Sequence, residues 1–279
     1  MPIITAYRHG VTAGIRNFSD HERARRGDCA GWTPRSTKGN LKFLRSVRME
    51  SLTGHGYAIT LTVRDCPPTP GDWARLRRSF VKRLERVGMI RMHWVTEWQR
   101  RGVPHLHAAV WTPEPLNTAE LYWHWLCVAG CYGAENRGQH LAPISDSLGW
   151  FQYVAKHAAR GAGHYQRSPQ NVPREWGSKT GRIWGKLGSW DLVEPTRHDL
   201  DHAGFYRLRR IVRAWRIADA RASGSPRRIA SARRMLACPD HTRSRVRGLS
   251  EWLRLEDLER VLGLLVQQGC ALEKVEENG

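Results

Sequence analysis

The sequence lacks long apolar runs, a dense set of cysteines and enough acidic residues to balance its basic ones. No stretch approaches the roughly 20 consecutive apolar residues that cross a bilayer, and the first residues lack the basic-then-apolar layout of a secretory signal. The 6 cysteines in 279 residues are scattered and do not form a disulfide framework. These absences argue against a membrane-spanning or exported protein, so we expect a cytoplasmic protein without a membrane partner.

The charge that is present is strongly basic. Lys and Arg number 45 against 26 Asp and Glu, which gives a net charge of +19 and a pI near 10.5. Such an excess indicates a polyanionic partner. Nucleic acid fits better than an anionic membrane surface, because the arginines occur in every third of the chain rather than on one amphipathic helix. With 41% hydrophobic residues and 13 Trp, the chain can also bury a substantial core.

Composition divides the chain into three zones. Residues 1–50 hold ten basic and four acidic residues with little periodicity, which predicts a basic N-terminal arm. Residues 51–192 alternate apolar runs with turn signals and contain most of the tryptophans, as a folded domain does. Residues 193–279 are predicted to form a helical, Arg-rich C-terminal region, since residues 205–247 carry thirteen Arg and two Asp.

The central zone alternates strand-like and helix-like segments. Dense β-branched and aromatic residues predict strands over 57–63, 89–98, 104–111 and 139–144. Capping residues followed by helical apolar spacing predict helices over 70–87, 118–128 and 147–160. This order predicts an α+β fold of the split βαβ type, ferredoxin-like or RRM-like, with an antiparallel sheet and helices on one face. A small α-helical region would follow it.

Glu97, His105 and His107 form the first candidate site. In a strand, alternate side chains share a face, so His105 and His107 point the same way. A hairpin turn near Arg101-Gly102 would set Glu97 opposite His105 on the neighbouring strand. Three ligands with open positions are typical of a catalytic metal site, and this set suits Mn²⁺, Mg²⁺ or Zn²⁺. The alternative is a surface hairpin whose polar face happens to carry two histidines.

A predicted helix holds the second candidate site. Tyr153, Lys156, His157 and Arg160 share one helical face at i, i+3, i+4 and i+7. A phenol near an ammonium group is a candidate nucleophile, because the cation favours the phenolate. The alternative is an ordinary amphipathic helix with a half-buried Tyr and a solvated Lys.

Together these motifs resemble the HUH endonucleases, and more closely the replication initiators of filamentous bacteriophages. The likeness runs from about residue 56 to residue 190, and four segments carry it: residues 59–62, 97–107, 153–156 and 181–185. The resemblance implies an enzyme that nicks one DNA strand at a replication origin and joins the 5′ phosphate to tyrosine. The freed 3′ hydroxyl then primes rolling-circle synthesis, and the enzyme later rejoins the ends.

Roles for individual residues follow from the same resemblance. His105 and His107 would hold a divalent cation, Mg²⁺ or Mn²⁺, with Glu97 as the third ligand. Tyr153 would attack the phosphate, and Lys156 would orient or activate it. Many relatives carry a second Tyr after this lysine, where the present chain has His157. Tyr165 is the second candidate for the nucleophile.

Basic and aromatic residues near these motifs are candidates for DNA contacts. They are Arg100, Arg101, Arg160, Arg182 and Trp184. The alternative for the tryptophan segment is a buried cover for the sheet edge. The expected partners are single-stranded or origin hairpin DNA and the helicase and polymerase of a bacterial host, whose cytoplasm would be the site of action if the gene belongs to a phage.

Three other functions stay open on the sequence. A transposase or plasmid relaxase shares the chemistry, but such relaxases usually place the tyrosine before the histidine motif, and here it follows by 46–48 residues. A non-catalytic single-strand binding module would not need Glu97 facing two histidines. A zinc hydrolase unrelated to DNA would leave the net charge of +19 unexplained.

Overall fold

The structure is a computed structural model, and it describes residues 2–15, 31–159, 165–177, 179–237 and 248–275. The chain divides into two compact units, one of residues 24–192 and one of residues 1–23 with 193–279. In the described part of the chain, no helix is both long and apolar enough to cross a lipid bilayer.

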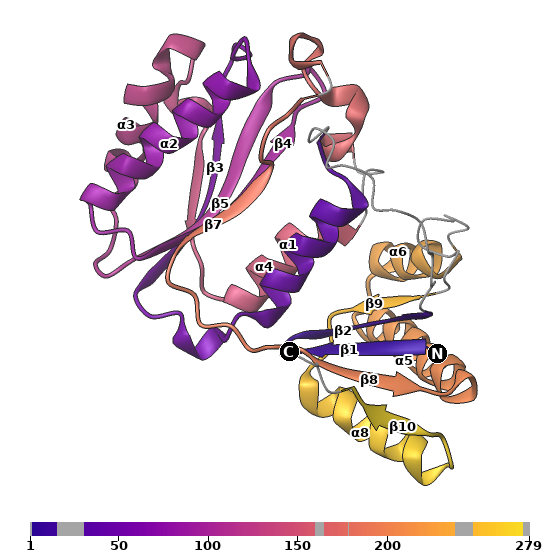
Figure 1. Ribbon diagram of the computed structural model, residues 1–279. Helices are drawn as coiled ribbons and strands as arrows, with labels where there is room; N and C mark the ends of the chain where they lie inside the picture. The colour runs from indigo at the N-terminus through magenta and orange to yellow at the C-terminus, as the bar shows by residue number, and fades with distance from the viewer. Residues whose placement is uncertain (1, 16–30, 160–164, 178, 238–247, 276–279) are drawn as a thin grey trace. The chain divides into compact units, whose positions relative to one another are not determined.

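An antiparallel sheet forms the centre of the unit of residues 24–192 (Figure 1). Its strands in chain order are β3 (His55–Thr62), β4 (Arg91–Trp98), β5 (Pro104–Thr112), β6 (His140–Pro143) and β7 (Trp184–Gly188). Their spatial order is β6-β3-β5-β4-β7, and every pairing is antiparallel. The predicted α+β class with a ferredoxin-like arrangement is confirmed, and β7 extends the sheet beyond β4.

Two helices cover one face of this sheet. The helix α2 (Pro70–Arg86) begins at Thr69, whose side chain accepts from the amide of Asp72 in a capping box. The helix α3 (Thr118–Ala129) begins at Asn117, whose side chain accepts from the amide of Ala119. Their apolar sides meet the sheet in a core that holds Trp73, Phe80, Trp125, Ile59, Leu61, Trp94 and Leu106. The capping signals in the sequence therefore located both helices.

The other face of the sheet is also covered, which differs from the expectation of helices on one face. The helices α1 (Pro34–Ser46) and α4 (Ser147–Ala159) lie there (Figure 1). Phe43 of α1 stacks on His93 at a ring-centroid distance of 5.5 Å, and Phe151 of α4 packs edge-on against Trp111. All 8 residues of β4 and all 9 residues of β5 are buried, as in strands that are enclosed on both sides.

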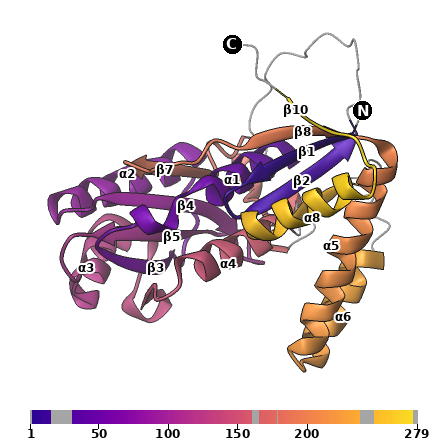
Figure 2. The ribbon, with the colours of Figure 1, turned by 90° about the horizontal axis from the view of Figure 1, so that it is seen from below.

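The remaining unit also contains a sheet. Its strands are β1 (Pro2–Tyr7), β2 (Gly10–Ile15), β8 (Thr196–Leu200), β9 (Leu249–Glu251) and β10 (Leu272–Lys274), in the spatial order β10-β8-β1-β2-β9. Its helices are α5 (His202–Ala222), α6 (Pro226–Ala237) and α8 (Leu255–Gln267). The helices α5 and α8 lie beside this sheet (Figure 2). Their apolar side chains, among them Phe205, Leu208, Leu258 and Leu262, pack against Ile4 and Val11.

The described structure differs from two expectations about the ends of the chain. Residues 1–50 are not one basic arm, because they contribute the hairpin of β1 and β2 and the helix α1. The C-terminal region of residues 193–279 adds three strands to its helices. Composition averaged over 50 residues could not predict the strand β1, whose burial alternates every two residues as in a half-buried strand.

Short 3-10 turns join the longer elements: η1 (Met49–Ser51), η2 (Gly130–Tyr132), η3 (Asn136–Gly138), η5 (Tyr165–Arg167), η6 (Pro169–Asn171) and η7 (Arg174–Trp176).

His93 should make the stability of the fold sensitive to acid. Its imidazole Nε2 lies 2.8 Å from Oδ1 of Asn40, and burial, helped by the charge of Arg167, lowers its pKa to about 3. The unfolded chain binds this proton near pH 6.5, so the stabilisation is complete above that pH and is lost as the pH falls toward 3. Urea unfolding at pH 7 and pH 5 should show the loss. In His93→Gln the change of the unfolding free energy with pH should be smaller by up to about 1.4 kcal/mol per pH unit. An unchanged pH dependence would contradict the low pKa of His93.

Candidate active site

The hairpin of β4 and β5 brings the two histidines and the glutamate together. Its register places Glu97 directly opposite His105, with Val95 opposite His107. The turn closes through a bond from the amide of Gln99 to the carbonyl of Val103, and Gly102 adopts the left-handed backbone that this turn requires, with φ of 74°. The predicted hairpin geometry is therefore present.

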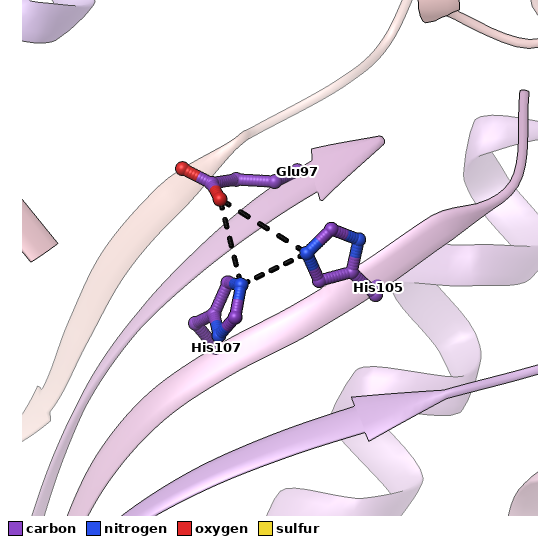
Figure 3. A group of neighbouring side chains, drawn as sticks. All are labelled: Glu97, His105 and His107. Carbon is purple, nitrogen blue, oxygen red and sulfur yellow. Dashed lines mark hydrogen bonds and ion pairs between the residues drawn. The ribbon is translucent and has the colours of Figure 1, made fainter. Parts of the chain in front are cut away.

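Three ligand atoms converge between these strands (Figure 3). Nε2 of His105 lies 2.8 Å from Nε2 of His107. Oε2 of Glu97 lies 3.4 Å from Nε2 of His107 and 4.0 Å from Nε2 of His105. All three side chains are buried, and one potential ligand atom from each lies within 4.8 Å of the others. Two imidazole nitrogens and one carboxylate oxygen at this spacing can ligate one divalent cation.

A neighbouring strand sets the orientation of one imidazole. Oγ1 of Thr60, on β3, lies 2.8 Å from Nδ1 of His107, the residue opposite Thr60 in the sheet. In the tautomer that donates Nδ1–H to this hydroxyl, the lone pair of Nε2 points toward Glu97 and His105. Burial lowers the pKa of His107, although the carboxylate of Glu97 opposes that effect. His107 is therefore neutral at pH 7, the form that binds a cation.

Arg167 is part of the site and was missed by the sequence analysis. It is fully buried in η5, and its Nε donates to Oε1 of Glu97 at 2.6 Å. Its Nη2 also donates to the carbonyl of Val154, on α4, at 3.4 Å. The guanidinium lies over the ring of Trp32, 3.7 Å from its centroid. Arg167 thus balances the charge of Glu97 through one carboxylate oxygen and leaves the other facing the imidazoles.

The residues before Arg167 also face the site. Nε2 of the Gln166 amide lies 3.2 Å from Nε2 of His105, and Tyr165 lines the same pocket of about 320 Å³ as both histidines. The three residues of η5 therefore line the pocket or contact the potential metal ligands Glu97 and His105. A 3-10 turn has no sequence periodicity, so only the cluster Tyr165-Gln166-Arg167 itself hinted at this role.

The two candidate nucleophiles come from different elements, α4 and η5. Tyr153 is on α4, and its ring stacks on Trp150 at 5.5 Å. Burial raises the pKa of Tyr153, and the charges of Glu97 and Tyr165 raise it further. This direction is opposite to the expected effect of Lys156, whose side chain lies outside the described part of the chain. Tyr165 lines the pocket, and the guanidinium of Arg100 lies 5.0 Å from its ring centroid.

The expected DNA contacts near the hairpin turn have different surroundings. Arg100 is exposed and lines the pocket. Arg101 is also exposed, but its guanidinium donates to the carbonyls of Val63 and Arg64 at 2.7 and 2.6 Å. Arg101 therefore fixes the backbone that follows β3, and a DNA contact would be an additional role.

The remaining expected contacts lie near β7 or outside the described chain. Arg182 is exposed just before β7. The ring of Trp184 stacks on Phe43 of α1, with centroids 6.3 Å apart, so this half-buried indole covers the edge of the sheet. Arg160 lies outside the described residues. Contact with DNA stays a prediction for all five residues.

Comparison with known proteins assigns the family. Over 275 residues the chain is 50% identical to the replication-associated protein G2P of Pseudomonas phage Pf3, covering 96% of this chain and 99% of the relative. It belongs to the replication-associated protein ORF2/G2P family. Residues 56–164 match the sequence profile of that family, described as "Replication-associated protein ORF2/G2P".

Two further relatives agree with this membership. A putative replication protein of Xylella fastidiosa strain 9a5c is 52% identical over 264 residues, which cover 92% of this chain and 93% of the relative. Another, from strain Temecula1, is 52% identical over 260 residues, which cover 90% of this chain and 99% of the relative. The membership confirms the resemblance to filamentous-phage replication proteins. No solved structure matches the chain significantly.

Proposed function

We propose that this chain initiates rolling-circle DNA replication as a metal-dependent enzyme that nicks and rejoins a single strand. Family membership supports the role in replication initiation. The observation that carries the chemistry is the convergence of Glu97, His105 and His107 beside a pocket that Tyr165 lines. Tyr153 is near enough for the charge of Glu97 to raise its pKa. This arrangement supports the HUH-type reaction that the motifs suggested.

The ligand group would hold Mg²⁺ or Mn²⁺. Two imidazole nitrogens and a carboxylate oxygen fit a divalent cation and would leave positions open for phosphate oxygens. When bound, the cation would polarise the scissile phosphate and stabilise the charge that builds on its oxygens. Thr60 and Arg167 keep His107 and Glu97 turned toward the cation position.

Tyr153 is the proposed nucleophile. Its phenolic oxygen forms a bond to phosphorus, the bond from phosphorus to the 3′ oxygen breaks, and the phenol proton passes to the leaving 3′ oxygen. Because the surroundings raise the pKa of Tyr153, the phenol is protonated at neutral pH before the attack. Lys156 would orient the phenol or the phosphate. Rejoining is the reverse reaction, with a 3′ hydroxyl attacking the phosphotyrosine.

The partners follow from this reaction. The substrate is single-stranded or hairpin DNA at the origin, and the free 3′ hydroxyl is a primer for the polymerase of the bacterial host. A host helicase would separate the strands ahead of synthesis. Given the phage relative, we place this reaction in the host cytoplasm.

Covalent trapping tests the function and the nucleophile together. Single-stranded DNA from the non-coding region of the parent replicon, labelled at its 3′ end, is incubated with Mn²⁺ or Mg²⁺ and resolved under denaturing conditions. We expect a labelled protein–DNA adduct that falls at least about 1,000-fold in Tyr153→Phe and persists in Tyr165→Phe.

Each of the other outcomes would indicate a different nucleophile or a different activity. Loss of the adduct in Tyr165→Phe alone would move the nucleophile to η5. Cleavage without any adduct would indicate a hydrolase, and binding without cleavage would indicate a non-catalytic binding module.

A further inference from the structure

Arg77 is a buried cation on the α2 side of the central sheet, the face opposite to the histidines. It is 8% exposed, and its guanidinium carbon lies 3.6 Å from the ring centroid of Trp94, on β4. Within the part of the chain that the structure describes, its buried Nη1 has no hydrogen-bond partner. A buried guanidinium usually has a carboxylate or carbonyl oxygen to receive its protons.

Among the described residues, the charged groups that shift the pKa of Arg77 are both arginines. Burial lowers its pKa to about 10, and the neighbouring charges of Arg78 and Arg182 contribute in the same direction. No carboxylate acts on it among the described residues. Arg167, a buried arginine on the other face, differs because Glu97 balances its charge. Arg77 therefore carries a buried charge that the described protein leaves uncompensated, and such a charge destabilises a fold unless an anion joins it.

The backbone next to Arg182 is bonded to β4, the strand that carries Glu97. The carbonyl of Ile183, the residue after Arg182, accepts from the amide of Thr96, the residue before Glu97, at 2.6 Å. Arg182 and Arg78 are exposed, and β7 is the edge strand of the sheet (Figure 1). Arg182 therefore lies at the edge of the sheet, beside the strand that carries Glu97.

We propose that Arg77, Arg78 and Arg182 form a binding site for a backbone phosphate of single-stranded DNA, separate from the metal centre. This assignment rests on the proposed function for its ligand. Guanidinium groups suit phosphate because their planar donors match its oxygens and they stay charged at physiological pH. The phosphate supplies the missing negative charge, and the stacking of Arg77 on Trp94 fixes the direction in which the guanidinium presents its donors.

The test compares Arg77→Met with Arg86→Met. Arg86 is an exposed arginine near the end of the same helix, so both variants lose one positive charge from α2. Affinity for an oligothymidylate of about 20 nucleotides is measured in EDTA from 50 to 300 mM salt. For Arg77→Met we expect a loss of about five- to tenfold at 50 mM salt and a salt slope smaller by about 0.7. Arg86→Met should lose less than about twofold, and Arg77→Lys should retain most of the slope.

Thermal unfolding separates this site from a purely structural arginine. Arg77→Met should unfold at the same or a higher temperature, because an uncompensated buried charge is replaced by an apolar side chain of similar length. A lower unfolding temperature with an unchanged salt slope would show that Arg77 only packs on Trp94 and would overturn the proposal. Stabilisation of the parent chain by inorganic phosphate, with DNA affinity unchanged in Arg77→Met, would overturn the assignment to DNA.

The measurement does not depend on catalysis. Because it is made without a divalent cation, failure of the nicking reaction would leave this result intact. Conversely, an intact covalent adduct together with equal salt slopes in Arg77→Met and Arg86→Met would overturn only the phosphate site.

Discussion

Alanine at position 105 is expected to abolish nicking while leaving the affinity for single-stranded DNA within about twofold of the parent chain. His105 supplies one of three converging ligand atoms, and its Nε2 is 2.8 Å from that of His107. Loss of a group that only supports a ligand weakens metal binding by about 10- to 100-fold, so loss of a ligand should exceed that range. Titration calorimetry with Mn²⁺ measures the affinity directly, and gel-shift assays in EDTA measure DNA binding.

Two further variants make this result specific. Thr60→Val removes the hydroxyl beside Nδ1 of His107 and should weaken Mn²⁺ binding by about 10- to 100-fold. His55→Ala removes an exposed imidazole at the start of β3 and should change neither quantity. If His105→Ala lost DNA binding and nicking to the same extent, His105 would be a structural residue rather than a ligand.

Replacing Arg167 by methionine should lower the free energy of unfolding by about 3–5 kcal/mol, the usual effect of breaking a buried ion pair from one side. The variant leaves the carboxylate of Glu97 buried without its guanidinium partner, and it removes the bond to the carbonyl of Val154. Because Val154 adjoins Tyr153 on α4, we expect the same change to loosen the helix that carries the proposed nucleophile. Urea unfolding in EDTA measures the effect without a bound cation.

A double-mutant cycle tests whether the ion pair is the cause. Glu97→Gln alone should also destabilise the fold, because it leaves Arg167 charged and buried. The combination of Glu97→Gln with Arg167→Met should be more stable than either single variant, since neither buried charge is then left alone. Additive losses would mean that Arg167 acts through its packing on Trp32 instead.

The parts of the fold that the sequence predicted well are local. Thr69 and Asn117 located the starts of α2 and α3, because a cap depends on residues three or fewer positions away. The register of Glu97 opposite His105 followed from the length of a single turn. In both cases the interacting groups are close along the chain, so spacing alone was enough.

The parts that the sequence did not predict depend on distant residues. β1 pairs with β8, and Ile3 lies opposite Asp199, a partner that no local pattern indicates. Arg167 and Glu97 are 70 positions apart, and a 3-10 turn has no periodicity to reveal the contact. The direction of the pKa shift at Tyr153 was also missed, because it comes first from burial and then from the carboxylate of Glu97, which lies on β4.

The pairing of β1 and β2 with β8 has a consequence for biosynthesis. The hairpin is made before its neighbours β8 and β9, which follow the whole of the central unit in the chain. At about 5–20 residues per second, translation of the intervening chain takes roughly 10–40 s. During that time the nascent hairpin exposes two strand edges and the apolar side chains of Ile4 and Val11. The central unit can fold co-translationally, whereas the other unit closes only after β8, β9 and β10 have also been made.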